Sequence, residues 1–170
     1  MELSKIVTAC PVVALEVVQF SDAVYILAAS GPNLLVYPIQ PTCSQSQSQE
    51  QPQPLVFPVL DSHSITAIKH VQDGLLLILA YKSLTLFQLQ STNPLHSHIV
   101  EHISPLRDLV LDAQIIRTAD RTPLLLIGYA QNFLDIYSLI EHRTLQTVKC
   151  PVVCVLFSLA IAPLASTQHE

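Results

Sequence analysis

A chain of 170 residues that is 50% hydrophobic, 12% charged and carries a net charge of −5 is long enough to bury one adequate core. Its eight Lys and Arg residues are scattered, which excludes the basic patch typical of nucleic-acid-binding proteins. The longest apolar stretch, Val152 to Ala165, is interrupted by Pro163 and falls short of the about 20 residues that a membrane-spanning helix needs, so we expect buried strands and no membrane association.

The chain opens with three predicted strands, at 11–18, 25–30 and 33–39. Gly31 and Pro32 separate the last two strands and are followed by Asn33. Glycine tolerates a positive φ and proline fixes its own φ near −65°, so this spacing predicts a tight hairpin.

A low-complexity segment, QPTCSQSQSQEQPQP at 40–54, follows the hairpin. It has almost nothing to bury, so we expect a disordered surface insertion. Residues 55–60 return as an outer strand, and Pro58 confines that strand to the edge of a sheet.

Two further repeats of this order follow. The second is predicted to contain a strand at 64–71, a turn at Asp73-Gly74, a strand pair within 75–89 and an outer strand at 98–103. The third is predicted to contain a strand at 106–117, a pair within 124–139 and an outer strand at 144–148, after which 152–162 opens a fourth set.

The segment 106–117 is ambiguous. Leu106, Leu109, Val110 and Ala113 fit helical spacing, whereas the branched side chains favour a strand. We predict a strand, because the segment occupies the place of 64–71 in the repeat before it.

Each strand pair ends in the same apolar pattern, with an aromatic residue at 37, 87 and 137. The pattern is Leu34, Val36, Tyr37 and Ile39 in the first repeat, Leu84, Leu86, Phe87 and Leu89 in the second, and Leu134, Ile136, Tyr137 and Leu139 in the third. A repeat of this length with several strands is typical of β-propeller blades. We therefore predict an all-β fold, an incomplete propeller of about three four-stranded units at 11–60, 64–103 and 106–148 plus one strand.

Catalytic and ligand-binding patterns are missing from the sequence. Three glycines cannot form a glycine-rich phosphate cradle, and no nucleophile, acid or base grouping emerges, so we expect no enzyme activity and no cofactor. His96, His98 and His102 share one face of a predicted strand, but positions 96 and 102 are about 20 Å apart in an extended chain, too far to bind one metal ion.

Two other groups of residues bear on function. Asp108 and Asp112 form a carboxylate pair only if their segment is helical, and in a strand they are expected to anchor turns or loops. The cysteines, at positions 10, 43, 150 and 154, form no CxxC pair, which favours reduced thiols in the cytosol or nucleus.

Five stretches resemble the WD-repeat-6 protein family, whose members are regulatory subunits of a tRNA wobble-position ribose 2′-O-methyltransferase. The first, PVVALEVV, resembles the family's opening strand. LAASGPNLLVYPI looks like the hairpin of the family's first blade, and RDLVLDAQII is similar to a family segment with two acidic residues four apart. GYAQNFLDIYSL resembles its strand pair around Asn132, and CPVVCVLFSLAI resembles a Cys-Pro stretch. The match runs in order from about 11 to 162 and corresponds to the amino-terminal WD40-like blades of longer proteins.

The resemblance implies a non-catalytic cytoplasmic subunit that binds a tRNA ribose 2′-O-methyltransferase and helps to present tRNA, with no small-molecule substrate. It places partner contacts in loops, at Asp108, Asp112 and Asn132, while Tyr37 and Phe87 are expected to be buried. Val153 stands where the family has a basic residue, so we expect tRNA to be bound through the complex. The alternative is a propeller scaffold for protein assemblies such as trafficking complexes, and an all-β enzyme is the third possibility.

Overall fold

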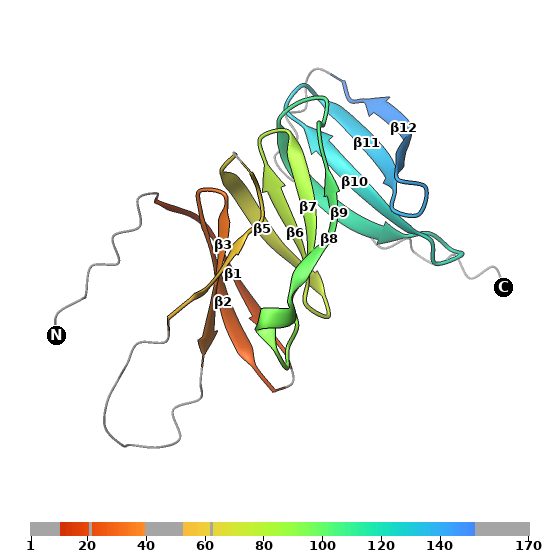
Figure 1. The fold of residues 1–170 in the computed structure, drawn as a ribbon. Helices are drawn as coiled ribbons and strands as arrows, with labels where there is room; N and C mark the ends of the chain where they lie inside the picture. The colour runs from red at the N-terminus through yellow and green to blue at the C-terminus, as the bar shows by residue number, and fades with distance from the viewer. Residues whose placement is uncertain (1–10, 21, 40–52, 62, 152–170) are drawn as a thin grey trace, which may run out of the picture. The chain divides into compact units, whose positions relative to one another are not determined.

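The computed structural model describes residues 11–20, 22–39, 53–61 and 63–151, and this part of the chain is all-β apart from one 3₁₀ turn (Figure 1). The elements are β1 (Val12–Gln19), β2 (Val24–Ser30), β3 (Asn33–Ile39), β4 (Leu55–Pro58), β5 (Ile65–Gln72), β6 (Leu75–Ala80), β7 (Ser83–Gln88), η1 (Pro94–His96), β8 (His98–Ile103), β9 (Val110–Arg117), β10 (Pro123–Tyr129), β11 (Phe133–Ser138) and β12 (Arg143–Lys149). The strand expected at 152–162 and most of the insertion expected at 40–54 lie outside the described residues.

The strands form three four-stranded sheets, each built from consecutive strands: sheet A (β1–β4), sheet B (β5–β8) and sheet C (β9–β12). Every strand pair with a resolved register is antiparallel. The predicted all-β fold with three four-stranded units is confirmed. The choice of a strand over a helix for 106–117 is correct for its last eight residues, which form β9, whereas residues 106–109 precede the strand.

The chain divides into two compact units, residues 1–110 and residues 111–170. Unit 1 contains sheets A and B, and unit 2 contains nearly all of sheet C.

Two turns follow the expected chemistry. Gly31 adopts a φ of 58° ahead of Pro32, which joins β2 to β3 by two residues, and Ser30 pairs with Asn33 across the turn. Asp73 and Gly74 both have positive φ, 47° and 76°, which is the requirement of a type I′ hairpin turn. The predicted turns at both places are confirmed.

The core of unit 1 lies between sheets A and B. Sheet A contributes alternate residues of β2 and β3, among them Leu27, Leu34 and Val36, and sheet B contributes Leu76, Ile78 and Phe87. Phe57 of the edge strand β4 packs edge-to-face on Phe87, with ring centroids 5.3 Å apart. Because β1 lies against β5 and residues two apart share a face, one face of each sheet is buried in this core.

The aromatic residues of the repeat differ in burial. Phe87 is 2% exposed, and Tyr137 is buried as well. Tyr37 is only half-buried, so the expectation that it is a core residue is wrong. The reason is its face: Tyr37 pairs with Ile26 on the side of sheet A that points away from sheet B.

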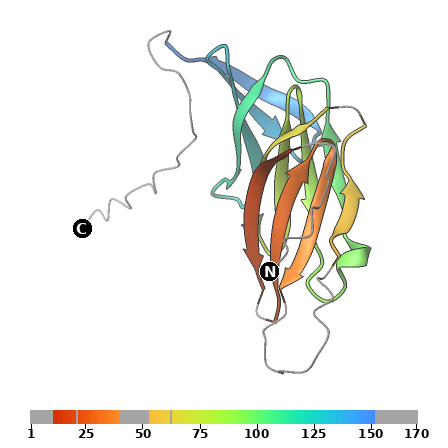
Figure 2. The same ribbon diagram turned by 90° about the vertical axis from the view of Figure 1, so that its left-hand side faces the viewer.

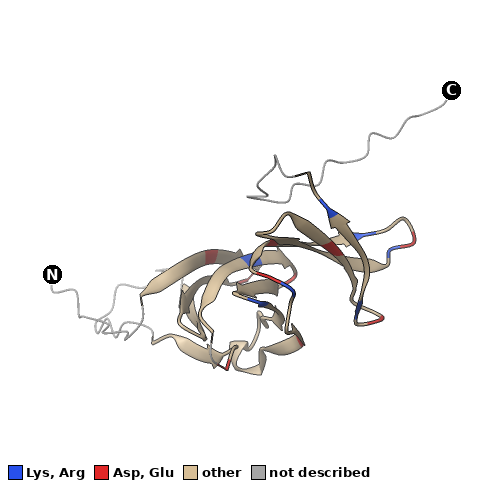
Figure 3. Cartoon of the chain, turned by 90° about the horizontal axis from the view of Figure 1, so that it is seen from above, with Lys and Arg blue, Asp and Glu red and all other residues tan. Residues whose placement is uncertain are grey.

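Unit 2 has one well-buried sheet face. Leu125 pairs with Tyr137 and Ile127 with Asp135, and all four of these residues are buried. The outer strand β12 is exposed along its whole length. Figure 3 shows the Lys and Arg positions spread along the ribbon of each unit, among mostly uncharged residues.

Candidate functional surface

The hairpin turns between the second and third strands of each sheet are tied to the chain that follows the outer strand. In sheet A, the Ile65 N–H donates to Gly31 O at 2.9 Å, and the Val59 and Leu60 N–H groups both donate to Pro32 O at 3.2 Å. In sheet B, the turn is Tyr81-Lys82, which accepts hydrogen bonds from Val110 (3.1 Å) and Leu106 (2.8 Å). We call the chain that follows an outer strand the crossing segment: residues 59–65 after β4 and residues 104–110 after β8. Backbone hydrogen bonds therefore hold the hairpin turn and the crossing segment together at one end of each of these two sheets.

Three side chains gather on this end of unit 1, and we call them the turn cluster: His63, Tyr81 and Lys82. The rings of His63 and Tyr81 are stacked, 6.5 Å apart at 14°, and Lys82 Nζ lies 5.6 Å from the Tyr81 ring centroid. Tyr81 nevertheless keeps 50% of its surface exposed. A cation near an aromatic face adds attraction, so the cluster is an ordered, half-exposed surface feature.

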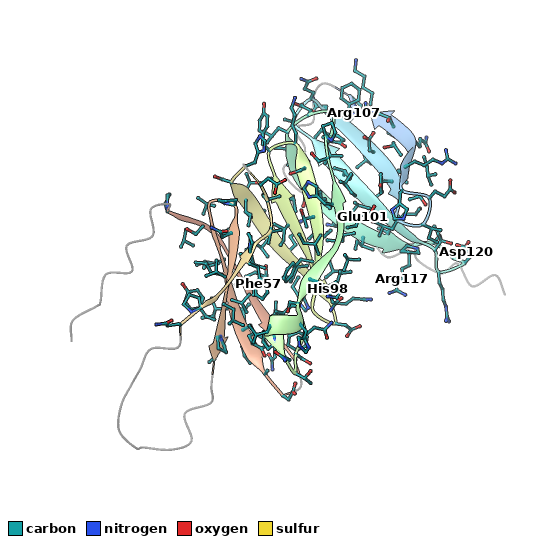
Figure 4. All side chains as sticks on the ribbon, in the orientation of Figure 1. Phe57, His98, Glu101, Arg107, Arg117 and Asp120 are labelled. Atoms are coloured by element: carbon teal, nitrogen blue, oxygen red, sulfur yellow. The ribbon has the colours of Figure 1, made fainter. Side chains whose placement is uncertain are left out.

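Asp108 lies on the crossing segment, between the two residues that donate to the Tyr81-Lys82 turn. Its Oδ2 atom is buried without a hydrogen-bond partner, whereas the neighbouring Arg107 is exposed (Figure 4). Most buried carboxylate oxygens have a partner, so a buried oxygen without one is unusual. The predicted loop position of Asp108 is confirmed, and its contact with a partner stays a prediction.

Asn132 lies in the turn between β10 and β11, which is the equivalent turn in sheet C. Its φ is 60°, its carbonyl oxygen accepts from the Cys150 N–H at 2.7 Å, and its N–H donates to Tyr129 O at 3.1 Å. Asparagine tolerates this left-handed conformation better than most residues. Its Oδ1 atom is buried without a hydrogen-bond partner. The expected loop position of Asn132 is correct, and its role in partner binding is untested.

Asp112 is not a loop residue. It lies inside β9, is 4% exposed, and its Oδ1 atom accepts the Ala113 N–H at 2.8 Å. The expectation of a loop anchor is wrong, because the strand extends through both Asp112 and Ala113 and turns the carboxylate inward. The suggested contact between Asp112 and a partner remains a prediction. Because the side chain is buried, the partner would have to contact β9 itself.

Sequence reasoning missed a buried polar network in unit 2. Asp135 accepts hydrogen bonds from Tyr129 Oη at 3.0 Å and from Thr147 Oγ1 at 2.6 Å, and it is 3% exposed. The three residues come from β10, β11 and β12. Such a network fixes the register of neighbouring strands, and no short motif announces it.

A second carboxylate, Asp120, caps the turn between β9 and β10 at one end of unit 2, near Arg117 (Figure 4). Thr118 Oγ1 donates to Asp120 Oδ1, Thr122 Oγ1 donates to Oδ2 at 2.9 Å, and the Thr122 N–H also points at Oδ1. These hydrogen bonds, Thr118 foremost, lower the pKa of Asp120 below its ordinary value of 3.8.

We expect the double substitution Thr118→Ala and Thr122→Ala to raise the Asp120 pKa towards its ordinary value, because it removes both side-chain hydrogen bonds and keeps only the backbone ones. Because the folded-state pKa is lowered, the contribution of Asp120 to stability is present above the unfolded pKa and is lost as the pH falls through the folded pKa. Carboxyl-carbon NMR titration measures the pKa directly. Thr144→Ala, on the exposed strand β12, serves as the control, and an unshifted Asp120 in the double variant contradicts the assignment.

Metal and membrane sites do not emerge from the described parts of the chain. No group of three His, Cys, Asp or Glu residues among them is placed to hold a metal ion. His96 lies in η1, and His102 of β8 shares a hydrogen bond of 2.8 Å with Thr85 Oγ1. None of the described helices has the length and hydrophobicity to cross a membrane.

Comparison with known proteins gives a likeness of fold. No protein-family model and no curated protein matches the chain. The crystal structure of the RRP9 WD40 repeats matches with a TM-score of 0.54 and 14% identity over 82% of this chain, and the chain spans 38% of that structure. The structure of U3-55K matches with the same TM-score and identity, and the chain spans 39% of it. The three sheets are therefore blades of the WD40 type, and this chain has the fold of WD40-repeat proteins.

Proposed function

We propose that this chain is a non-catalytic binding subunit whose contact surface is the turn cluster. The observation that carries this proposal is the half-exposed, ordered Tyr81 beside His63 and Lys82, on a WD40-type sheet. Tyrosine is enriched among the residues that dominate protein interfaces. Backbone bonds hold the cluster in place before any partner arrives, which lowers the entropy lost on binding.

The finer proposal concerns the partner. We infer a tRNA ribose 2′-O-methyltransferase that modifies the wobble nucleotide in the cytoplasm, with the chain helping to present tRNA to it. Support comes from the resemblance of five stretches to the WD-repeat-6 family. Two of these stretches carry hairpin turns, Gly31-Pro32 and the turn at Asn132. Asp108 lies on the crossing segment beside the turn cluster and is the first of the suggested partner contacts to test.

The test is co-purification followed by mapping of ribose methylation at the wobble nucleotide. Cells that express the parent protein with Tyr81→Ala and Lys82→Glu are expected to recover less methyltransferase and to show less wobble 2′-O-methylation than wild-type cells. Lys149→Glu, the same charge reversal on the exposed strand β12, should leave both readouts unchanged. Deletion of the protein should lower wobble methylation further.

A second candidate, a scaffold for other protein assemblies, rests on the WD40 fold alone. It replaces the methylation proposal if wobble methylation is unchanged in deleted cells while Tyr81→Ala still releases co-purifying proteins. If the turn-cluster variants release nothing at all, the contact surface lies elsewhere.

A further inference from the structure

Ser104 begins the crossing segment that follows β8, and both Ser104 and Pro105 are exposed. Arg107 lies three positions after Ser104 and is exposed too (Figure 4). A serine followed by proline, with a basic residue three positions after the serine, is the pattern that proline-directed protein kinases accept. Ser104 is the one position of the sequence that has this pattern.

The chain has one other pair in which a hydroxyl residue precedes proline, Thr122-Pro123. Leu125 stands three positions after Thr122, in place of a basic residue, and it is buried. Thr122 is half-buried, and its hydroxyl group already donates a hydrogen bond to Asp120 at 2.9 Å. Ser104 is therefore the better kinase substrate, both by sequence and by access.

Lys82 of the turn cluster is a close neighbour of Ser104 across sheet B. Ile103 pairs with Leu84 at the end of β8. Two residues beyond Ser104, the Leu106 N–H donates to Lys82 O at 2.8 Å, so the two stretches of chain stay side by side. Figure 2 shows this crossing segment arching over the turn between β6 and β7. Neighbouring strands are about 4.8 Å apart, a distance that an extended lysine side chain spans.

A phosphate on Ser104 would change the charge beside the turn cluster. Phosphoserine carries about two negative charges at pH 7 and three strong acceptor oxygens. Without the phosphate, Lys82 Nζ lies 5.6 Å from the Tyr81 ring centroid. A dianionic phosphate attracts an ammonium group more strongly than an exposed aromatic face does, because the phosphate also accepts charge-assisted hydrogen bonds. The Lys82 side chain would therefore move from Tyr81 to the phosphate.

We propose that Ser104 is a phosphorylation site for a proline-directed protein kinase, and that Lys82 binds the phosphate and leaves the Tyr81 ring. In the transfer, Ser104 Oγ attacks the γ-phosphorus of ATP, the bond between that phosphorus and the bridging oxygen of ADP breaks, and the hydroxyl proton passes to a base of the kinase. Phosphorylation thereby removes the cation from the turn cluster and weakens partner binding, a consequence that rests on the function proposed above.

The first experiment treats the whole 170-residue chain with a purified cyclin-dependent protein kinase and ATP, and maps the phosphate by mass spectrometry. We expect a phosphate on Ser104, which Ser104→Ala abolishes. Arg107→Gln should slow its incorporation several-fold, whereas Thr122→Ala should leave the rate unchanged. A chain that takes up no phosphate on Ser104, or takes it up on Thr122 instead, overturns the proposal. Far-ultraviolet circular dichroism before treatment confirms that each variant is folded.

Phosphorus NMR titration of the phosphorylated chain tests the role of Lys82. Because a nearby ammonium group favours the dianion, the second pKa of the phosphate should lie about half a pH unit or more below its ordinary value of about 6. Lys82→Gln should raise this pKa towards the ordinary value, and Lys149→Gln, on the exposed strand β12, should not change it. Equal pKa values in the wild-type chain and in Lys82→Gln overturn the assignment of Lys82 as the phosphate ligand.

Co-purification separates this proposal from the proposed function. The phosphorylated parent protein should recover less partner than the unphosphorylated protein, and Ser104→Ala should make recovery insensitive to the kinase. Equal recovery with and without the phosphate overturns the regulatory step, while the phosphorylation site stands on the mapping and the titration. Turn-cluster variants that release no partner overturn the contact surface instead, and they leave the phosphorylation site untouched.

Discussion

Phe87→Ala is expected to lower the free energy of unfolding of unit 1 by about 3–5 kcal/mol. Phe87 is 2% exposed and fills the space between sheets A and B, where its ring meets Phe57 edge-to-face. The substitution removes that aromatic contact and leaves a cavity that two sheets can collapse into only in part. Urea unfolding followed by far-ultraviolet circular dichroism measures the loss, since the chain has no tryptophan.

Tyr37→Ala is the matched control, because Tyr37 holds the same place in the first repeat but is half-buried. Tyr37→Ala should cost clearly less unfolding free energy than Phe87→Ala. Equal losses at the two positions would contradict the assignment of Phe87 to a covered face and Tyr37 to an open one.

Gly74→Ala should also destabilise unit 1 strongly. Gly74 has a φ of 76°, and an alanine in the left-handed region costs about 1–2 kcal/mol. An added Cβ would lie 2.8 Å from Phe20 Cζ and impossibly close to the Leu89 carbonyl oxygen, which adds about 1–3 kcal/mol of crowding. The Leu89 N–H also donates to Gly74 O, so moving the turn away weakens that bond.

Asp73→Asn tests whether the turn itself or only the glycine is sensitive. Asp73 is exposed and has a φ of 47°, which asparagine tolerates well. We expect a change in unfolding free energy within about 0.5 kcal/mol, as for most surface substitutions. If Gly74→Ala is as mild as Asp73→Asn in the same urea series, the close approach of Gly74 to Leu89 does not hold in solution.

Strand order and turns could be predicted from the sequence because their signals are local. Gly31-Pro32 and Asp73-Gly74 each favour a backbone conformation with positive φ. Gly31-Pro32 forms the turn between β2 and β3, and Asp73-Gly74 forms the turn between β5 and β6. The ambiguous segment 106–117 was resolved by its place in the repeat, which a single periodicity could not do.

Burial was harder to predict, because it depends on which sheet covers which face. Tyr37 and Phe87 hold the same place in the repeat, yet Phe87 faces the core and Tyr37 does not. Asp112 looked like a loop residue and lies inside a strand. The contacts of the candidate surface span the chain: His63 stacks on Tyr81, eighteen positions away by their numbers, and no motif links them.

The consecutive strand order of all three sheets has a consequence for folding during synthesis. Every strand of a sheet pairs only with its neighbours in the chain, so each sheet can form as soon as its own strands have left the ribosome. Two bonds in unit 1 join sheet A to sheet B or to the chain beyond it: the Ile65 N–H donates to Gly31 O at 2.9 Å, and Tyr25 Oη donates to Ser91 O at 2.8 Å across 66 positions. The Tyr25 bond must wait until β7 is complete, which makes the joining of sheets A and B, and not the pairing within either, the late step of folding in unit 1.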